Sequence, residues 1–175
     1  TYNLIMEAMK TSAREGNAVQ IPRCDMHPFV AALPFKLTDC QKNAIKQTFE
    51  DMASDKPMSR LLQGDVGSGK TAVCAALMYR TAKAGFQSAL MAPTELLANQ
   101  HYNTLNGLLS DLSVRCELLT GATKQAERKR ILEALVSGEI DILIGTHALF
   151  SENVIYKNLA LVVADEQHRF GVRQR

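Results

Sequence analysis

The chain has 175 residues with 20 Lys and Arg against 18 Asp and Glu, so its formal net charge is only +2. This length suits one globular domain, and a 46% hydrophobic content is enough for a buried core. The near-balanced charge excludes a protein that binds nucleic acid through its composition alone, so any such contact must be local.

Cysteine spacing and hydropathy exclude further classes. The four cysteines at positions 24, 40, 74 and 116 form no CxxC pair and no metal-ligand pattern, which predicts reduced thiols. No apolar run approaches the ~18 residues of a membrane span, and the N-terminus has no signal-peptide pattern. We therefore expect a cytoplasmic protein without a membrane partner.

Residues 1–33 predict a helix followed by a linker. Leu4, Ile5 and Ala8 recur at helical spacing, which favours an amphipathic helix over 1–15. Three prolines between residues 16 and 34 argue against a long helix or a central strand there. The chain begins with Thr rather than Met and ends in GVRQR, so we expect a piece of a longer protein.

From residue 34 onward, helical and strand patterns alternate. The predicted elements are helix 38–53, strand 60–63, helix 70–84, strand 87–92, helix 94–109, strand 114–119, helix 123–137, strand 140–144 and strand 159–164. The runs ALMA, DILIG and LALVVA are continuously apolar, as in strands buried on both faces. Parallel strands need crossover helices, and helices of suitable length lie between them. The sequence predicts an α/β fold with a mostly parallel sheet.

The stretch GDVGSGKT, residues 64–71, fits the phosphate-loop pattern of a glycine, four residues, then Gly-Lys-Thr. Phosphates need several inward-facing backbone N–H groups, and small residues let the backbone approach closely. The predicted cradle comprises Gly64, Asp65, Val66, Gly67, Ser68 and Gly69. Lys70 would reach the β and γ phosphates, and the Thr71 hydroxyl would ligate Mg²⁺. A simple glycine turn is the alternative, but the strand before and the helix after favour the phosphate loop.

A second polar pair follows the buried run LALVVA. Asp165 and Glu166 fall at the carboxyl end of this strand, where ligands bind in parallel sheets. Asp165 would hold Mg²⁺ through its water shell, and Glu166 would orient the attacking water. By themselves two acids after a strand could form a polar turn. Together with the glycine loop they predict a magnesium-dependent nucleoside triphosphatase.

Gln41 has two interpretations. Thr38 followed three residues later by Gln41 is a capping box, in which the glutamine satisfies a backbone N–H at a helix start. A glutamine amide can also pair bidentately with adenine N6 and N7. Because Phe35 lies six residues upstream, we favour adenine recognition by Phe35 and Gln41.

Five motifs together carry a family resemblance: LPFKLT with Gln41, GDVGSGKT, APTELLANQH at 92–101, GTHALF at 145–150 and DEQHRFGV at 165–172. From about Ala31 onward the chain resembles the first motor lobe of the RecG-type branched-DNA helicases of superfamily two. The transcription-repair coupling factor is a near alternative, but its pattern has a second glutamate where this chain has Gln167. A P-loop NTPase module without a nucleic-acid role is the other alternative.

The resemblance implies a RecA-like P-loop NTPase fold in three layers. Residues 34–175 would be the first motor lobe, ending after the DEQH motif, and residues 1–33 would come from a preceding domain. In this architecture the strand carrying motif III lies between the strands of the glycine loop and the carboxylates. The sheet is therefore expected to be incomplete at the C-terminus, with a gap or a rearrangement at its centre.

The resemblance also assigns roles to residues. Lys70, Asp165, Glu166, Gln167 and His168 would be catalytic, with the last two sensing the γ-phosphate. Loops along the DNA backbone would be formed by Pro93, Thr94 and Glu95 of motif Ia, Thr120 and Gly121 of motif Ib, and Gly145, Thr146 and His147 of motif Ic. Taken alone, the threonines could equally be helix caps or turn residues, and His147 a structural histidine.

The implied activity is that of an ATP-dependent DNA helicase acting in recombination and repair at stalled forks and Holliday junctions. Its partners would be branched DNA and the second RecA-like lobe and wedge domain of the same parent chain, in the bacterial cytoplasm with the nucleoid. Arginines from the second lobe would supply ~10³–10⁵ in rate, so the isolated lobe should hydrolyse ATP hardly at all. The mixed-charge stretch 124–135 is interpreted as a solvated helix face rather than a DNA contact.

Overall fold

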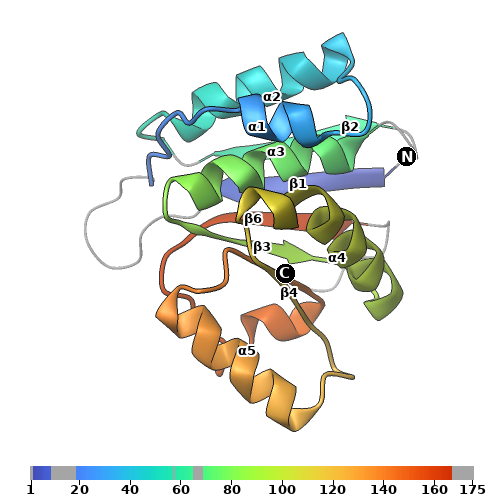
Figure 1. Ribbon diagram of the computed structural model, residues 1–175, viewed down its shortest axis with the longest axis vertical. Coiled ribbons are helices and arrows are strands. Elements are labelled where there is room, and N and C mark those ends of the chain that lie inside the picture. Colours follow the sequence, from blue (N-terminus) through green and yellow to red (C-terminus); the bar gives the residue numbers. More distant parts are fainter. Residues whose placement is uncertain (1, 9–18, 57, 65–68, 167–175) are drawn as a thin grey trace, which may run out of the picture.

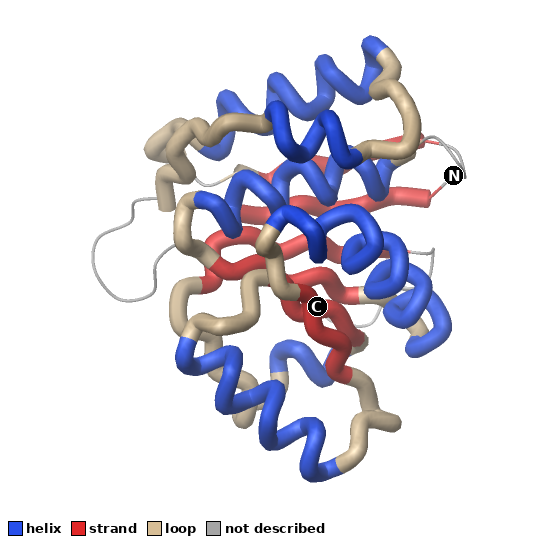
Figure 2. Tube along the Cα trace, in the orientation of Figure 1, coloured by secondary structure: helices blue, strands red, loops and turns tan. Residues whose placement is uncertain are grey.

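The computed structural model describes residues 2–8, 19–56, 58–64 and 69–166, which form an α/β domain around one six-stranded sheet (Figures 1 and 2). Its strands are β1 (Tyr2–Ala8), β2 (Ser59–Gly64), β3 (Gln87–Met91), β4 (Cys116–Leu119), β5 (Ile142–Gly145) and β6 (Leu159–Glu166). Its helices are α1 (His27–Ala32), α2 (Asp39–Met52), α3 (Lys70–Lys83), α4 (Glu95–Leu109) and α5 (Gln125–Ser137), with short 3-10 turns η1 (Ser110–Leu112) and η2 (His147–Phe150).

The predicted elements between α2 and β6 are confirmed, and each end agrees within two residues. Two helix starts show why the local sequence was informative. Thr38 caps α2 through a complete capping box with Gln41, and the Thr94 hydroxyl accepts a hydrogen bond from the backbone N–H of Leu97 at the start of α4. Each cap satisfies a backbone donor that the first helical turn leaves unpaired.

The prediction of a helix over residues 1–15 is wrong for the part that the structure describes. Residues 2–8 form β1, which runs antiparallel to both β2 and β6 and lies between them. An empty place there would leave two rows of backbone N–H and C=O groups unpaired in the middle of the sheet. In this structure β1 occupies the place between β2 and β6, because pairing with two strands outweighs a local helical pattern. The remainder of the predicted helix lies outside the described residues.

The prediction of an irregular linker over 16–34 is wrong for residues 27–32, which form α1. Pro28 counted against a helix, but it occupies the first turn of α1. A proline is tolerated there because the backbone N–H it lacks would have no intrahelical acceptor. Phe29 of this short helix is buried, and its ring lies 5.6 Å from the Tyr79 ring of α3.

Two hydrophobic cores lie on opposite faces of the sheet, which gives three layers (Figure 1). The larger core packs α2, α3 and α4 against one face, and the smaller core packs α5 and η2 against the other. Successive residues of β3 alternate between them: Leu90 belongs to the larger core and Ala89 to the smaller. The predicted three-layer RecA-like architecture with a mostly parallel sheet is confirmed.

Strand direction decides where the loops gather. β6, β3, β5 and β4 are parallel neighbours, and β2 has the same direction because β2 and β6 are both antiparallel to β1. The carboxyl ends of these strands therefore meet at one edge of the sheet. We call it the loop edge; it is defined by Gly64, Met91, Leu119, Gly145 and Glu166, the last residues of the five strands.

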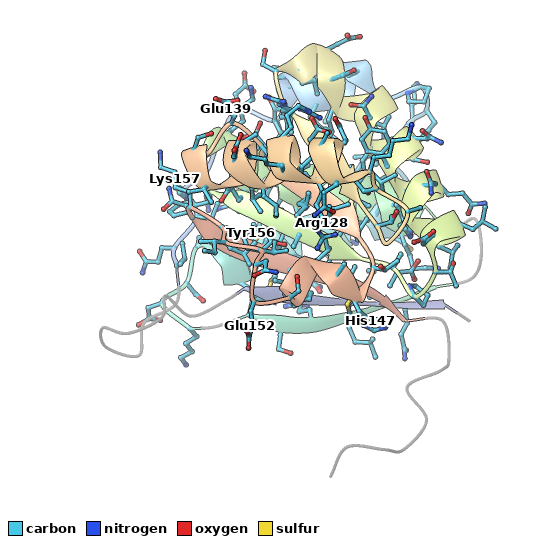
Figure 3. All side chains as sticks on the ribbon, turned by 90° about the horizontal axis from the view of Figure 1, so that it is seen from below. Arg128, Glu139, His147, Glu152, Tyr156 and Lys157 are labelled. Carbon is cyan, nitrogen blue, oxygen red and sulfur yellow. The ribbon has the colours of Figure 1, made fainter. Side chains whose placement is uncertain are left out.

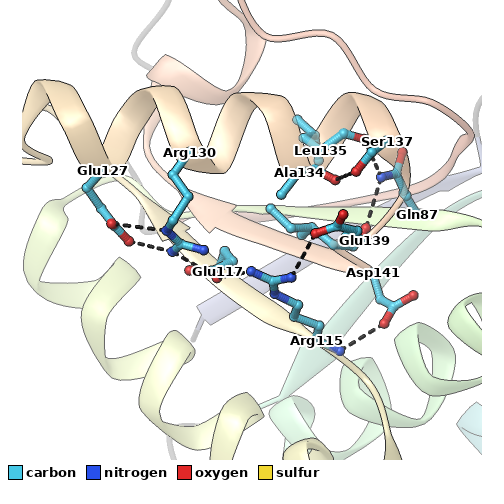
Figure 4. A network of polar contacts seen from close by, with 11 residues as sticks. Gln87, Arg115, Glu117, Glu127, Arg130, Ala134, Leu135, Ser137, Glu139 and Asp141 are labelled. Carbon is cyan, nitrogen blue, oxygen red and sulfur yellow. Dashed lines mark hydrogen bonds and ion pairs between the residues drawn. The ribbon is translucent and has the colours of Figure 1, made fainter.

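The opposite edge is held together by polar contacts (Figure 4). The buried Gln87 side chain at the start of β3 donates two hydrogen bonds of 2.9 Å, one to the carbonyl of Leu135 and one to that of Ile140. Its carbonyl oxygen accepts the backbone N–H of Asn158, just before β6. One glutamine thus ties the end of α5 and the entry to β6 onto β3, and its buried polar atoms are satisfied.

Candidate active site

The ends of β2 and β6 lie level with each other at the loop edge. In the strand register, Leu4 of β1 pairs with Leu62 on one side and with Asp165 on the other. Since neighbouring strands lie about 4.8 Å apart, these two residues are roughly 10 Å apart across β1. The start of the glycine loop and the end of β6 therefore lie at the same edge of the sheet, as the sequence predicted.

The glycine loop returns to the sheet at the start of α3. Gly69 is the N-cap of α3 with a left-handed φ of 76°, a conformation that glycine adopts without strain. The Lys70 Nζ donates a hydrogen bond of 2.6 Å to the carbonyl of Gly64, so the lysine side chain bridges the entry and the exit of the loop. Thr71 occupies the first turn of α3, where backbone N–H groups lack intrahelical acceptors. The predicted loop residues Asp65, Val66, Gly67 and Ser68 lie outside the described residues.

Asp165 is largely enclosed and has a partner that the sequence reasoning missed. Its Oδ2 lies 2.6 Å from the Nε2 of His101, and the two side chains are 11% and 16% exposed. His101 was noted only as part of the motif APTELLANQH. The sequence signal that could have identified His101 is its position on one face of α4 with Ala98 and Leu105, which are fully buried against the sheet. Glu166 ends β6, while its side chain, Gln167 and His168 lie outside the described residues.

Both charged groups of the site influence the pKa of the buried Cys74 thiol. This thiol of α3 is buried, and burial raises its pKa to about 12, with the negative charge of Asp165 acting in the same direction and Lys70 opposing it. Lys70 and Asp165 therefore both lie within electrostatic range of this thiol near the start of α3.

The donor set fits a metal that arrives with a nucleotide. No group of three or more His, Cys, Asp or Glu side chains within the described part of the chain could hold an ion. Protein sites for Mg²⁺ commonly use one or two carboxylates and complete the shell with substrate phosphates and water. The Thr71 hydroxyl and the Asp165 carboxylate would supply such a partial set, and neither belongs to a dedicated metal cage among the described residues.

Gln41 serves the capping box and also touches the glycine loop. Its Oε1 accepts the backbone N–H of Thr38 at 2.8 Å, which confirms the capping interpretation. Its Nε2 lies so close to Gly69 that a Cβ at that position would be 1.8 Å away. A carbonyl oxygen has a second lone pair, so capping leaves adenine recognition open. Phe35 is 46% exposed and lines a cavity of about 440 Å³ with Pro34 and Leu37.

The residues expected along DNA divide by exposure. Thr94, Glu95, Gly121 and His147 are exposed at the loop edge, and Pro93 and Thr146 are half-buried. His147 can be followed in Figure 3, where it lies on η2 just after β5. The Glu95 Oε1 accepts a hydrogen bond of 3.2 Å from the backbone N–H of Ala122. The start of α4, after β3, is thereby connected to the loop after β4.

Thr120 and Gly145 are buried instead. The backbone N–H of Thr120 donates to the Thr123 hydroxyl within its own turn. A Cβ at Gly145 would lie 2.0 Å from the carbonyl oxygen of Leu119, so only glycine allows β5 to approach the end of β4 this closely. Because both residues are buried, they contribute to the packing beneath these loops.

The basic stretch of α5 behaves mainly as a solvated face. Arg130 pairs with Glu127 and with Glu117 of β4, and Lys129 lies 3.9 Å from Glu133. Ile131 and Leu135 are fully buried on the opposite side of this helix. The acids thus offset much of the positive charge that this helix carries.

A family model described as DEAD/DEAH box helicase matches residues 38–175. The chain belongs to the DEAD/DEAH box helicase family. Membership implies the use of a nucleotide, ATP, with Mg²⁺ as the ion typical of the family. The family model covers every described element from α2 to β6.

Individual relatives agree with the RecG-type resemblance. The chain is 47% identical to the ATP-dependent DNA helicase RecG of Bacillus subtilis (strain 168), over 99% of this chain and 26% of that protein. It is 52% identical to RecG of Thermotoga maritima over 84% of this chain and 19% of that protein. A solved structure of RecG bound to a three-way DNA junction matches with a TM-score of 0.74 and 46% identity, covering 80% of this chain and 20% of that one.

The resemblance to RecG-type helicases is therefore confirmed, and the chain spans about a quarter of the length of the curated relatives it matches. Within the described residues, no helix is both long enough and apolar enough to cross a bilayer.

Proposed function

We propose that this chain is the ATP-binding first motor lobe of a DNA helicase that remodels branched DNA during recombination and repair. The observation that carries the proposal is the level placement of the β2 and β6 ends, which brings Lys70 and Asp165 to one side of the sheet. A loop that binds phosphates and an acid that binds the metal must face each other across one Mg·ATP. The high identity to RecG proteins supports the branched-DNA part of the proposal.

Each site residue has a proposed role. The backbone of residues 64–69 cradles the phosphates, Lys70 binds the β and γ phosphates, and Thr71 with Asp165 holds Mg²⁺. Glu166 orients the attacking water, and Gln167 and His168 respond to the γ-phosphate. Phe35 stacks on adenine while Gln41 reads its edge.

The part of the loop edge formed by the ends of β3, β4 and β5 is the proposed DNA-binding surface. A motor that moves along DNA must grip phosphates without reading bases, using hydroxyls, backbone N–H groups and helix N-termini. Thr94, Gly121, Thr146 and His147 have exposed or half-exposed positions suited to this role. Glu95, Thr120 and Gly145 contribute by setting the shape of these loops. Pro93 fixes the backbone immediately before the cap of α4.

The remaining domains of the proposed helicase would belong to the parent protein. We propose that a second RecA-like lobe closes over the nucleotide and that a wedge domain recognises the branch point. The matched RecG proteins are bacterial, which supports action on the nucleoid in the bacterial cytoplasm.

The test is DNA-stimulated ATP hydrolysis by the parent protein, measured with and without a synthetic three-way junction. Lys70→Ala should abolish the stimulated rate because the phosphates lose their lysine. Lys83→Ala is the matched control: Lys83 ends the same helix α3, about 20 Å from Lys70, and its Nζ donates to the Leu112 carbonyl. This variant should keep the wild-type rate.

Three outcomes would overturn the proposal. Stimulation that survives Lys70→Ala would mean that the glycine loop is not the ATP site. ATP turnover in the wild-type protein that ignores every DNA added would favour a P-loop module with no nucleic-acid role. A parent chain with a polymerase-binding domain in place of the wedge would favour the coupling-factor alternative.

A further inference from the structure

The contact between His101 and Asp165 joins two parts of the site that are far apart in sequence. It spans 64 residues and brings the Nε2 of a histidine in α4 within 2.6 Å of the Oδ2 of the acid at the end of β6. An ionised carboxylate only accepts hydrogen bonds, so the imidazole nitrogen donates and Nε2 carries the proton. With Oδ2 engaged in this way, the orientation of the Asp165 carboxylate is set by α4.

The position of α4 is itself set from the loop edge. Thr94 caps the helix, and the Glu95 carboxylate holds the backbone N–H of Ala122 in the loop after β4. His101 lies seven residues after Thr94, which corresponds to about 10 Å, or two turns, along the helix. Ala98 and Leu105 on either side of His101 are fully buried and fasten this face of α4 to the sheet. α4 is therefore a rigid element with the proposed DNA loops at one end and the Asp165 carboxylate two turns further on.

We propose that His101 is a positioning residue that orients Asp165 for the metal and couples its orientation to DNA binding through α4. The proposal rests on the proposed function, because Asp165 has a metal to hold only if the site binds Mg·ATP. His101 touches neither nucleotide nor DNA in this scheme; it acts through the acid. Groups that orient a metal-binding carboxylate in this way typically contribute 10- to 100-fold to metal affinity or activity.

The experiment uses the full-length parent protein and three α4 variants. His101→Ala removes the donor, and His101→Gln places an amide Nε2–H at a similar reach. Thr104→Ala is the control, because Thr104 is exposed on the same helix and its hydroxyl bonds only within α4, to the Gln100 carbonyl. Each variant is measured for ATP hydrolysis, for binding of a fluorescent ADP analogue with and without Mg²⁺, and for junction binding with and without that nucleotide.

His101→Ala should lower the junction-stimulated kcat about 10- to 100-fold while the KM for ATP changes less than about threefold. Mg²⁺ should tighten binding of the ADP analogue at least several-fold less than in the wild type. The nucleotide should also shift junction affinity less, whereas junction binding without nucleotide stays unchanged, because coupling between two sites is reciprocal. His101→Gln should recover most of the stimulated rate, and Thr104→Ala should match the wild type in every measurement.

A His101→Ala protein with wild-type kcat and wild-type Mg²⁺ dependence would overturn the proposal. Equal losses in His101→Ala and His101→Gln, accompanied by a lower Tm and weaker junction binding without nucleotide, would also overturn it, because a purely structural contact behaves that way. These failures differ from failure of the proposed function, in which the wild-type protein itself shows no stimulation or Lys70→Ala retains it.

Discussion

β5 and β2 belong to the same sheet, yet their surroundings differ. Every residue of β5 is buried, whereas β2 alternates, and Leu61 is 52% exposed. The reason is coverage: the core under α5 and η2 includes residues of β3, β4, β5 and β6 but no described side chain of β2. The region of β3, β5 and β4 is packed on both faces, while the region of β2 is packed on one.

The two regions are also completed differently. The first is a run of parallel neighbours joined by α4 and α5, and β3 also pairs directly with β6. The second reaches β6 only through β1, an antiparallel strand contributed by residues 2–8. This comparison teaches that the proposed DNA side of the sheet is built from segments that follow one another in the chain, whereas the proposed nucleotide side depends on a strand that is distant in sequence. The following predictions compare the stability of the two regions.

The largest effect is expected at Arg80 of α3, on the nucleotide side. This arginine is fully buried and donates to the carbonyls of Ile21, Pro22 and Phe49, and its guanidinium lies 4.6 Å from the centre of the Phe49 ring. Burial lowers its pKa. Arg80→Met should reduce the free energy of unfolding by about 3–5 kcal/mol, because three carbonyls lose a charged donor.

Chemical denaturation measures this loss. The matched control is Arg115→Met, immediately before β4, whose side chain is 41% exposed and pairs with Glu117 and Glu139. That change should cost under about 1 kcal/mol. Similar losses at the two positions would contradict the assignment of Arg80 as the tie between α3, α2 and residues 21–22.

The next effect compares the two strands directly. Leu143→Ala in β5 should cost about 2–5 kcal/mol, since it removes a fully buried side chain from the core under α5 and η2. Leu61→Ala in β2 should cost less than about 1 kcal/mol because half of that side chain already meets water. Urea unfolding curves of the two variants measure these two losses of stability. Equal midpoints would mean that β2 is covered on both faces in solution.

Alanine substitutions at two glycines should change the free energy of unfolding by smaller amounts and in opposite directions. Gly145→Ala should destabilise by about 1–3 kcal/mol, because its Cβ would meet the Leu119 carbonyl at 2.0 Å and the Leu149 side chain at 2.9 Å. Gly107→Ala in α4, where a Cβ meets nothing within 4 Å, should stabilise by about 0.5–1 kcal/mol. Thermal unfolding of both variants should show Tm shifts in opposite directions. A neutral Gly145→Ala would contradict the tight approach of β4 to β5.

The smallest effect is a pH dependence from one thiol on each side. Burial raises the pKa of Cys74 and of Cys116 to about 12, against about 9 in the unfolded chain. Below pH 9 both states keep the proton and stability is unaffected. As the pH rises from 9 towards 12 only the unfolded chain releases it, so the free energy of unfolding falls by about 1 kcal/mol per thiol between pH 8 and 10.

Urea titrations at pH 8 and pH 10 under reducing conditions measure this slope. The double variant Cys74→Ala, Cys116→Ala should show a flatter dependence than the wild type, and Cys40→Ala, at an exposed position, should not. An unchanged slope in the double variant would mean that these thiols are not desolvated in the folded protein.

Local sequence determined most of the elements and the predicted chemistry. Apolar runs such as DILIG specify buried strands, Thr38 and Thr94 specify helix starts, and GDVGSGKT specifies a phosphate loop, because each depends on residues near in sequence. For the same reason α2 through β6 could be predicted to within two residues.

Tertiary structure alone decided the features that depend on distant segments. Residues 2–8 carry a helical pattern but form β1, because two strands offer them backbone partners that a lone helix cannot match. Gly145 and Thr120 resemble contact residues in sequence but are buried, and His101 gained a role only when α4 was placed beside β6. Backbone pairing and burial are properties of the assembled sheet, and neither can be read from the residues near in sequence.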